Sequence, residues 1–114
     1  MLSESIIEQA ANDHFTAEAT SQPGLPLSIN YPEMTLEDGY AIQKKWVEKK
    51  IAEGQKVIGY KIGYTSRAMQ KALHIEEPDF GVLLDSMMFN DGAQIEISRF
   101  CDPRIEVELA FVLK

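Results

Sequence analysis

The hydrophobic period of the sequence changes midway along the chain, and this change limits the folds that the chain can adopt. Residues 3–15 and 36–53 carry apolar side chains at intervals of three and four, which is the period of an amphipathic α-helix. Residues 56–64 instead alternate, which is the period of a β-strand. Helical and strand patterns in separate parts of a chain are typical of an α+β fold. We therefore predict a helical region over residues 1–55 and a β-rich region over residues 56–114.

The helix predicted over residues 36–53 has the clearest limits. Thr35 is a favoured N-cap residue, and Gly54 ends the pattern. The apolar residues predicted to be buried are Leu36, Tyr40, Val47 and Ile51. The lysines on this helix are predicted to form a solvated face, and they are Lys44, Lys45, Lys49 and Lys50. The proline-rich stretch SQPGLPLSINYPEM, which precedes the helix, is predicted to be an extended connection.

The strand predicted over residues 56–64 presents one lysine on an otherwise bare face. Lys61 shares its face with Val57, Gly59 and Gly63, whereas the other face is apolar. Because glycine weakens a strand, the two glycines beside Lys61 indicate that another group approaches the backbone closely there. The residues after the strand predict a short helix whose apolar side chains face inward, namely Met69, Ala72 and Leu73.

Three further strands are predicted towards the end of the sequence. VLLDSMMF and AQIEIS flank the turn-forming triplet Asn90-Asp91-Gly92, and PRIEVELAFVLK has the alternating pattern of a last strand. In that strand Glu106 and Glu108 project from one face, with backbones about 6.6 Å apart. Two such carboxylates repel unless a cation lies between them, and a hard divalent ion prefers oxygen ligands. The alternative is a solvated strand face on which Arg104 pairs with Glu106.

Composition excludes several classes of function. The net charge of −7 opposes binding to nucleic acid, and no apolar run reaches the length of a membrane helix. The first residues lack the basic start of a signal peptide, and a single cysteine excludes an internal disulfide framework. We therefore expect a cytoplasmic protein that has no nucleic-acid partner and does not span a membrane.

Three motifs together resemble a known family. They are GYKIGYTSRAMQ at residues 59–70, EPDFGVLLDSM at residues 77–87 and PRIEVELAFVL at residues 103–113. In this order they resemble the hydratases of meta-cleavage pathways of aromatic catabolism, within the fumarylacetoacetate hydrolase superfamily. The resemblance covers nearly all of this chain but less than half of a typical member, and the last strand pattern stops in mid-run. We therefore expect the start of a β-rich core of that type, apparently truncated.

The resemblance implies a metal site. In this family an E-x-E pair and a third glutamate about thirty residues further on hold Mg²⁺ or Mn²⁺. The pair corresponds to Glu106 and Glu108, and the third ligand is expected beyond Lys114.

The resemblance also implies residues for proton transfer and substrate binding. Lys61 and Asp79 correspond to residues implicated in acid–base chemistry, and Thr65 and Ser66 are placed to donate hydrogen bonds to the substrate carboxylate. From the residues alone, Asp79 is more typical of a turn after a proline, and a helix cap is at least as expected for either hydroxyl as substrate binding.

The implied activity is that of a lyase. A metal-dependent hydratase of this family adds water to a 2-hydroxy-2,4-dienoate, or its 2-oxo-4-enoate tautomer, and yields a 4-hydroxy-2-oxo acid. The expected substrate is 2-oxo-hept-4-ene-1,7-dioate. Hydration of 2-oxopent-4-enoate, decarboxylation of 4-oxalocrotonate and an inactive oligomerising fragment are the alternatives. A homo-oligomer, associated with a decarboxylase of the pathway, is the expected assembly.

Overall fold

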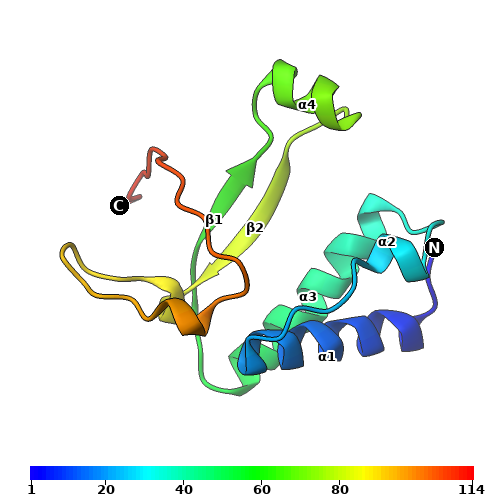
Figure 1. Cartoon of the computed structure of the whole chain (residues 1–114), viewed down its shortest axis with the longest axis horizontal. Helices are drawn as coiled ribbons and strands as arrows, with labels where there is room; N and C mark the ends of the chain where they lie inside the picture. Colours follow the sequence, from blue (N-terminus) through cyan, green and yellow to red (C-terminus); the bar gives the residue numbers. More distant parts are fainter.

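The helical part of the molecule is built on two helices that lie side by side (Figure 1). The computed structural model describes all residues from 1 to 114. Helix α1 spans Glu4–Thr20, and helix α3 spans Leu36–Ala52. Ala10 and Ala11 of α1 are buried against Ile42 of α3, and these short side chains let the two helices approach closely.

The connection between these helices contains a short helix that the sequence did not predict. Helix α2 spans Leu27–Asn30, in the middle of the proline-rich stretch. Pro26 directly precedes it, where its fixed φ suits a helix start and its missing N–H costs nothing.

Asp38 ties the start of α1 to the start of α3. Its carboxylate accepts hydrogen bonds from the backbone N–H of Leu2 and of Thr35, each 2.9 Å long. The Thr35 hydroxyl accepts in return from the Asp38 N–H, which completes a capping box. The backbone bonds from Thr35 and Leu2 hold the pKa of Asp38 below its usual value.

Lys50 corrects the prediction of a solvated lysine face. Its side chain is buried, and its ammonium lies 2.7 Å from the Glu18 carboxylate of α1. The same ammonium lies 4.8 Å from the Phe15 ring centroid and 5.1 Å from that of Trp46. The aromatic rings and the carboxylate together stabilise the buried ammonium, which has lost its contact with water.

The buried stripe of α3 also differs from the predicted one. Val47 is buried as predicted, but Leu36 and Ile51 are 46% and 50% exposed. Ile42, which was not predicted to be buried, packs against α1, and Lys50 lies beside Glu18 of the same helix. Spacing along one helix defines possible faces, but the position of the neighbouring helix selects one of them.

The β part is an antiparallel pair of strands joined through a short helix. Strand β1 spans Val57–Gly63, helix α4 spans Arg67–Leu73 and strand β2 spans Asp79–Leu84. Helix α4 lies at the far end of the hairpin (Figure 1). Met69, Ala72 and Leu73 are exposed there, so the prediction that they face inward is wrong for this structure. No element of the chain packs on α4 to cover them.

Helix α3 contacts the outer edge of β2 and so joins the two parts. The Tyr40 ring stacks on that of Phe80, with centroids 4.6 Å apart and planes inclined at 20°. The Gln43 side chain donates to the Phe80 carbonyl over 3.4 Å and accepts from the Val82 N–H over 3.1 Å.

The last third of the chain has little regular structure. Beyond β2 there are only two 3₁₀ turns, Asp85–Met87 and Ile97–Arg99, so the strand predicted from AQIEIS is wrong. The strand predicted over residues 103–114 is also absent. A strand needs a neighbouring backbone for its hydrogen bonds, and none lies beside this segment. Its large apolar side chains are 84% to 98% exposed.

The chain as a whole is more open than a closed domain of its length. Its radius of gyration is 15.5 Å, against about 13 Å expected for a compact domain of this size. Only seven of its residues are buried. The α+β prediction is confirmed in its coarse form, because helices precede a two-stranded sheet. No helix has the length and apolar character needed to cross a membrane.

We predict that Asp38→Ala destabilises the packing of α1 on α3. The pKa of Asp38 is lowered in the folded chain, so its carboxylate stabilises the fold above the ordinary value of 3.8. That contribution is lost as the pH falls below 3.8 and through the lower folded value. Thermal unfolding followed by circular dichroism should give a lower Tm for the variant at neutral pH and a smaller further decrease in acid. Asp13→Ala, on the exposed face of α1, is the control and should leave the Tm nearly unchanged.

Candidate functional site

The register of the hairpin places Lys61 and Asp79 on the same face of the sheet. Lys61 lies directly opposite Gly81, and Gly63 lies directly opposite Asp79. Residues opposite each other, and residues two apart on one strand, share a face. The amine and the carboxylate are therefore diagonal neighbours, and glycines occupy the other two corners.

The two glycines leave the room that these side chains use. A methyl group on Gly63 would clash with Asp79 Oδ1 and lie 3.5 Å from Lys61 Nζ. A methyl group on Gly81 would lie 3.2 Å from Lys61 Cγ. At Gly59, by contrast, the nearest atom would be Leu83 Cδ1 at an ordinary 3.9 Å. The close approach predicted beside Lys61 is therefore confirmed at Gly63 and absent at Gly59.

A pocket of about 340 Å³ opens on this face. Strand β1, the turn after it, the start of β2 and the C-terminal segment all contribute to its walls. The lining residues are Lys61, Ile62, Gly63, Tyr64, Thr65, Ser66, Met69, Asp79, Glu106 and Glu108. All six candidate site residues from the sequence are among them, although they come from three separate segments. Their roles stay predictions.

The turn after β1 holds its shape through specific contacts. Tyr64 has a φ of 52°, in the left-handed region, and the Gln70 side chain donates a 2.8 Å hydrogen bond to its carbonyl. Ser66 is the N-cap of α4, and its hydroxyl accepts from the Met69 N–H over 3.2 Å. The capping alternative for Ser66 is therefore confirmed. A capping hydroxyl still keeps its own proton for donation, so Ser66 can cap α4 and bind a carboxylate.

Glu106 and Glu108 reach the pocket from a segment without regular structure. Both are exposed, and neither forms an ion pair. Arg104 pairs with Asp102 at 3.3 Å, so the predicted pairing of Arg104 with Glu106 is wrong. No group of three or more His, Cys, Asp or Glu side chains gathers as a metal site within these residues. The chemistry of the donors fits a divalent ion, since both are carboxylates, but they form an incomplete ligand set.

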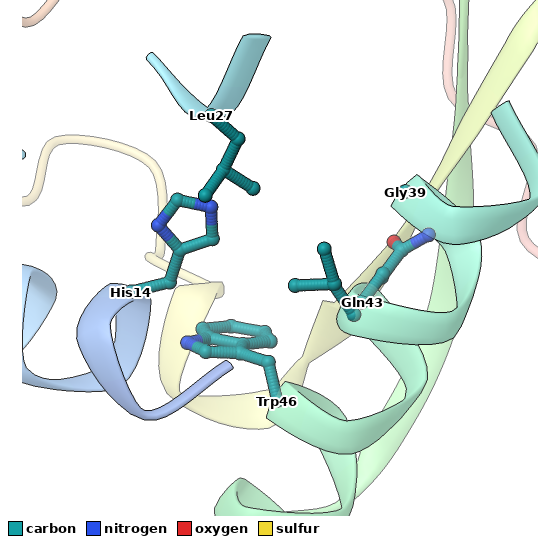
Figure 2. Close-up of a pocket in the computed structure, with 6 residues that line it drawn as sticks. His14, Leu27, Gly39, Gln43 and Trp46 are labelled. Atoms are coloured by element: carbon teal, nitrogen blue, oxygen red, sulfur yellow. The ribbon is translucent and has the colours of Figure 1, made fainter. Parts of the chain in front are cut away.

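A second pocket, of about 290 Å³, lies between the helices and is mostly apolar. His14 of α1 and Leu27 of α2 lie opposite Gln43 and Trp46 of α3 (Figure 2). This pocket contains no acid–base pair and no carboxylate. The residues predicted to act as acid, base and metal ligands all line the pocket at the hairpin, which makes that pocket the candidate site.

Sequence reasoning missed three residues that shape the site. Gly81 lies under the Lys61 stem, Gln70 holds the turn at Tyr64, and Gln43 binds the edge of β2. Gly81 belongs to the stretch EPDFG, which is typical of a loop, and the two glutamines fall within ordinary helical patterns. Their roles depend on strand register and on helix packing, which local sequence does not define.

Comparison with curated proteins identifies the relatives of this chain. It is 60% identical over 87 residues to 2-oxo-hept-4-ene-1,7-dioate hydratase of Escherichia coli, a match over 76% of this chain and 33% of that protein. It is 41% identical over 106 residues to 2-keto-4-pentenoate hydratase of Paraburkholderia xenovorans strain LB400, over 93% of this chain and 39% of that protein. The chain is a relative of these hydratases. No family model matches the sequence.

A solved structure supports the relationship between this chain and the hydratases. The 4-oxalocrotonate decarboxylase of Pseudomonas putida G7, complexed with magnesium and adipate, matches with a TM-score of 0.73 and 30% identity. The match covers 75% of this chain and 33% of that one. The chain thus spans about a third of the length of the Escherichia coli hydratase and of the decarboxylase. The resemblance predicted from the three motifs is confirmed.

We predict that Gly63→Ala disrupts the site, whereas Gly59→Ala does not. Both positions lie on one strand and one face, so intrinsic strand propensity changes equally in the two variants. Only the methyl at 63 meets the Asp79 carboxylate, which has to move away from Lys61. Substrate turnover by the full-length protein should fall about tenfold or more for Gly63→Ala. Equal losses in the two variants would show that the Gly63–Asp79 approach is irrelevant to the site.

Proposed function

We propose that the chain forms part of a divalent-metal-dependent hydratase that adds water to a 2-hydroxy-2,4-dienoate, or its 2-oxo-4-enoate tautomer. The observation that supports it is the composition of one pocket, which combines a lysine, an aspartate, two hydroxyls and an E-x-E pair. The hydratase names of the relatives support the same reaction class. The rest of the enzyme, of the fumarylacetoacetate hydrolase type, would cover the apolar side chains that this chain leaves exposed.

In this proposal Glu106 and Glu108 hold Mg²⁺ or Mn²⁺. Two carboxylates are too few for tight binding, so water, substrate and a ligand from outside these residues supply the remaining oxygens. A bound ion would supply Lewis-acid stabilisation of the negative charge that develops on the 2-oxo group of the substrate. The decarboxylase structures with magnesium and with calcium support a divalent ion.

Lys61 and Asp79 perform the proton transfers in this mechanism. The C2 hydroxyl of the dienol loses a proton and C5 gains one, which gives the conjugated enone. The oxygen of water then bonds to C4 and loses one proton, and a proton is delivered to C3. Each transfer needs a group that can alternate between acid and base beside the substrate, and the amine and carboxylate at diagonal corners provide two. Thr65 and Ser66 donate hydrogen bonds to the C1 carboxylate and orient it.

The seven-carbon dicarboxylate 2-oxo-hept-4-ene-1,7-dioate is the proposed substrate. The relative named for it has 60% identity, against 41% for the 2-keto-4-pentenoate hydratase. Decarboxylation of 4-oxalocrotonate is the second candidate, because the structural neighbour is such a decarboxylase and holds the dicarboxylate adipate. We further propose a cytoplasmic homo-oligomer that associates with a decarboxylase of the pathway.

We predict that the full-length protein converts 2-hydroxyhepta-2,4-diene-1,7-dioate only when Mg²⁺ or Mn²⁺ is present. The ultraviolet absorbance of the diene should decrease without release of CO₂, and chelation of the metal should stop the reaction. The same assay with 2-hydroxypenta-2,4-dienoate measures the preference for the second carboxylate. Release of CO₂ from 4-oxalocrotonate would favour the decarboxylase, and no metal-dependent reaction with any of these acids would contradict the proposal.

We predict that Glu106→Gln and Glu108→Gln each reduce turnover by about a hundredfold or more, because a lost ligand weakens metal binding. Calorimetric titration with Mg²⁺ should show the weaker affinity, and circular dichroism should be unchanged since both side chains are exposed. Glu96→Gln, an exposed glutamate outside the pocket, is the matched control. Wild-type turnover in either pocket variant would remove that residue from the metal site.

We predict that Lys61→Ala lowers kcat by about a hundredfold, which is the usual contribution of a general acid or base. The Mg²⁺ dissociation constant should change far less, because Lys61 is proposed to transfer protons and not to bind the ion. Lys71→Ala on α4 is the control, since its side chain is exposed and lies outside the pocket. Equal losses of kcat and metal affinity in Lys61→Ala would assign the lysine to the metal site instead.

A further inference from the structure

We infer that Gln43 is a positioning residue for the site, and that its side-chain amide holds strand β2 in the position that sets Asp79 diagonally across from Lys61. Gln43 belongs to helix α3 and does not line the hairpin pocket. The chemical role of Lys61 and Asp79 rests on the proposed function. The positioning itself rests on contacts of the described residues alone.

Gln43 binds the outer edge of β2 in the manner of a neighbouring strand. Strand β1 pairs with the inner edge of β2, which leaves every second N–H and C=O of β2 directed outward. Gln43 Nε2 donates to the Phe80 carbonyl over 3.4 Å, and Gln43 Oε1 accepts from the Val82 N–H over 3.1 Å. One side chain thus occupies two backbone groups that would otherwise lack protein partners.

These two bonds flank the residue that supports Lys61. Gly81 lies between Phe80 and Val82 and directly opposite Lys61. The Cβ position of Gly81 lies 3.2 Å from Lys61 Cγ, 3.5 Å from Lys61 Cδ and 3.8 Å from Gln43 Oε1. The Gly81 backbone is therefore enclosed by the lysine stem and the glutamine amide, so a shift of β2 changes where the amine lies.

The same bonds reach Asp79 through the adjacent residue. Asp79 precedes Phe80, and α3 holds Phe80 twice, at its carbonyl by Gln43 and at its ring by the stacked Tyr40. Losing the amide removes both hydrogen bonds between α3 and β2 and leaves the stacking of Tyr40 on Phe80. The carboxylate and the lysine stem then lose a common support, while Glu106 and Glu108 lie on a different segment.

Gln43→Met in the full-length protein tests the inference. Methionine has the same length and a similar helix propensity, so the change removes two hydrogen bonds with little change in volume. Gln9→Met on α1 is the matched control, because Gln9 is exposed and bonds only within its own helix. We expect faster amide hydrogen exchange at Val82, a kcat about tenfold lower and an unchanged Mg²⁺ dissociation constant in Gln43→Met alone.

The outcomes separate this inference from the proposed function. If the wild type hydrates the dienoate and Gln43→Met keeps its kcat, the inference is overturned and the proposed function stands. Equal losses of kcat and Mg²⁺ affinity would overturn it too, since they indicate general damage to the fold. If the wild type shows no metal-dependent hydration, the proposed function fails. Crystal structures of both proteins then decide the inference, which unchanged Lys61 and Asp79 positions would overturn.

Discussion

The pairing of β1 with β2 is the interaction on which the candidate site depends. A slip of one residue would turn Lys61 or Asp79 to the opposite face, because successive side chains of a strand alternate. The observed register sets Lys61 opposite Gly81 and Asp79 opposite Gly63, so each charged side chain lies across from a glycine, which has no side chain. The glycines are costly for strand stability, and the contacts of Gln43 and Tyr40 with β2 compensate by fixing that strand on α3.

Local sequence predicted the parts of the fold that local interactions determine. Thr35 and Ser66 cap their helices where the sequence indicated, because a cap depends only on residues two or three positions away. The face of β1 that carries Lys61 was also predicted, because the alternation of side chains along a strand depends only on neighbouring positions. The burial of Lys50 was not predictable, since it requires Glu18, Phe15 and Trp46 to surround the ammonium. That arrangement exists only once α1 and α3 have packed.

The candidate site likewise has features that the sequence predicts and features that depend on how the elements pack. The sequence named six residues that line one pocket, four of them from motif resemblance and two from their position after the lysine strand. Only the register explains why Asp79 and Lys61 share a face, and only helix packing brings Gln43 to β2. The failed prediction of a strand over residues 103–114 has a physical cause. The alternating pattern is real, yet an extended segment becomes a strand only beside another backbone that accepts its hydrogen bonds. Pattern describes what a segment can form, and partners determine whether it does.

The two halves of the site therefore depend on different interactions. Lys61 and Asp79 are held by the pairing of β1 with β2 and by the contacts of α3 with β2, all of which lie within these residues. Glu106 and Glu108 belong to a segment with exposed apolar side chains and no strand partner among these residues. Any backbone that pairs with this segment would fix the spacing of the two carboxylates and place the alternating apolar residues on the opposite face of the strand. Metal affinity would then be coupled to that pairing, whereas the geometry of the acid–base pair would not.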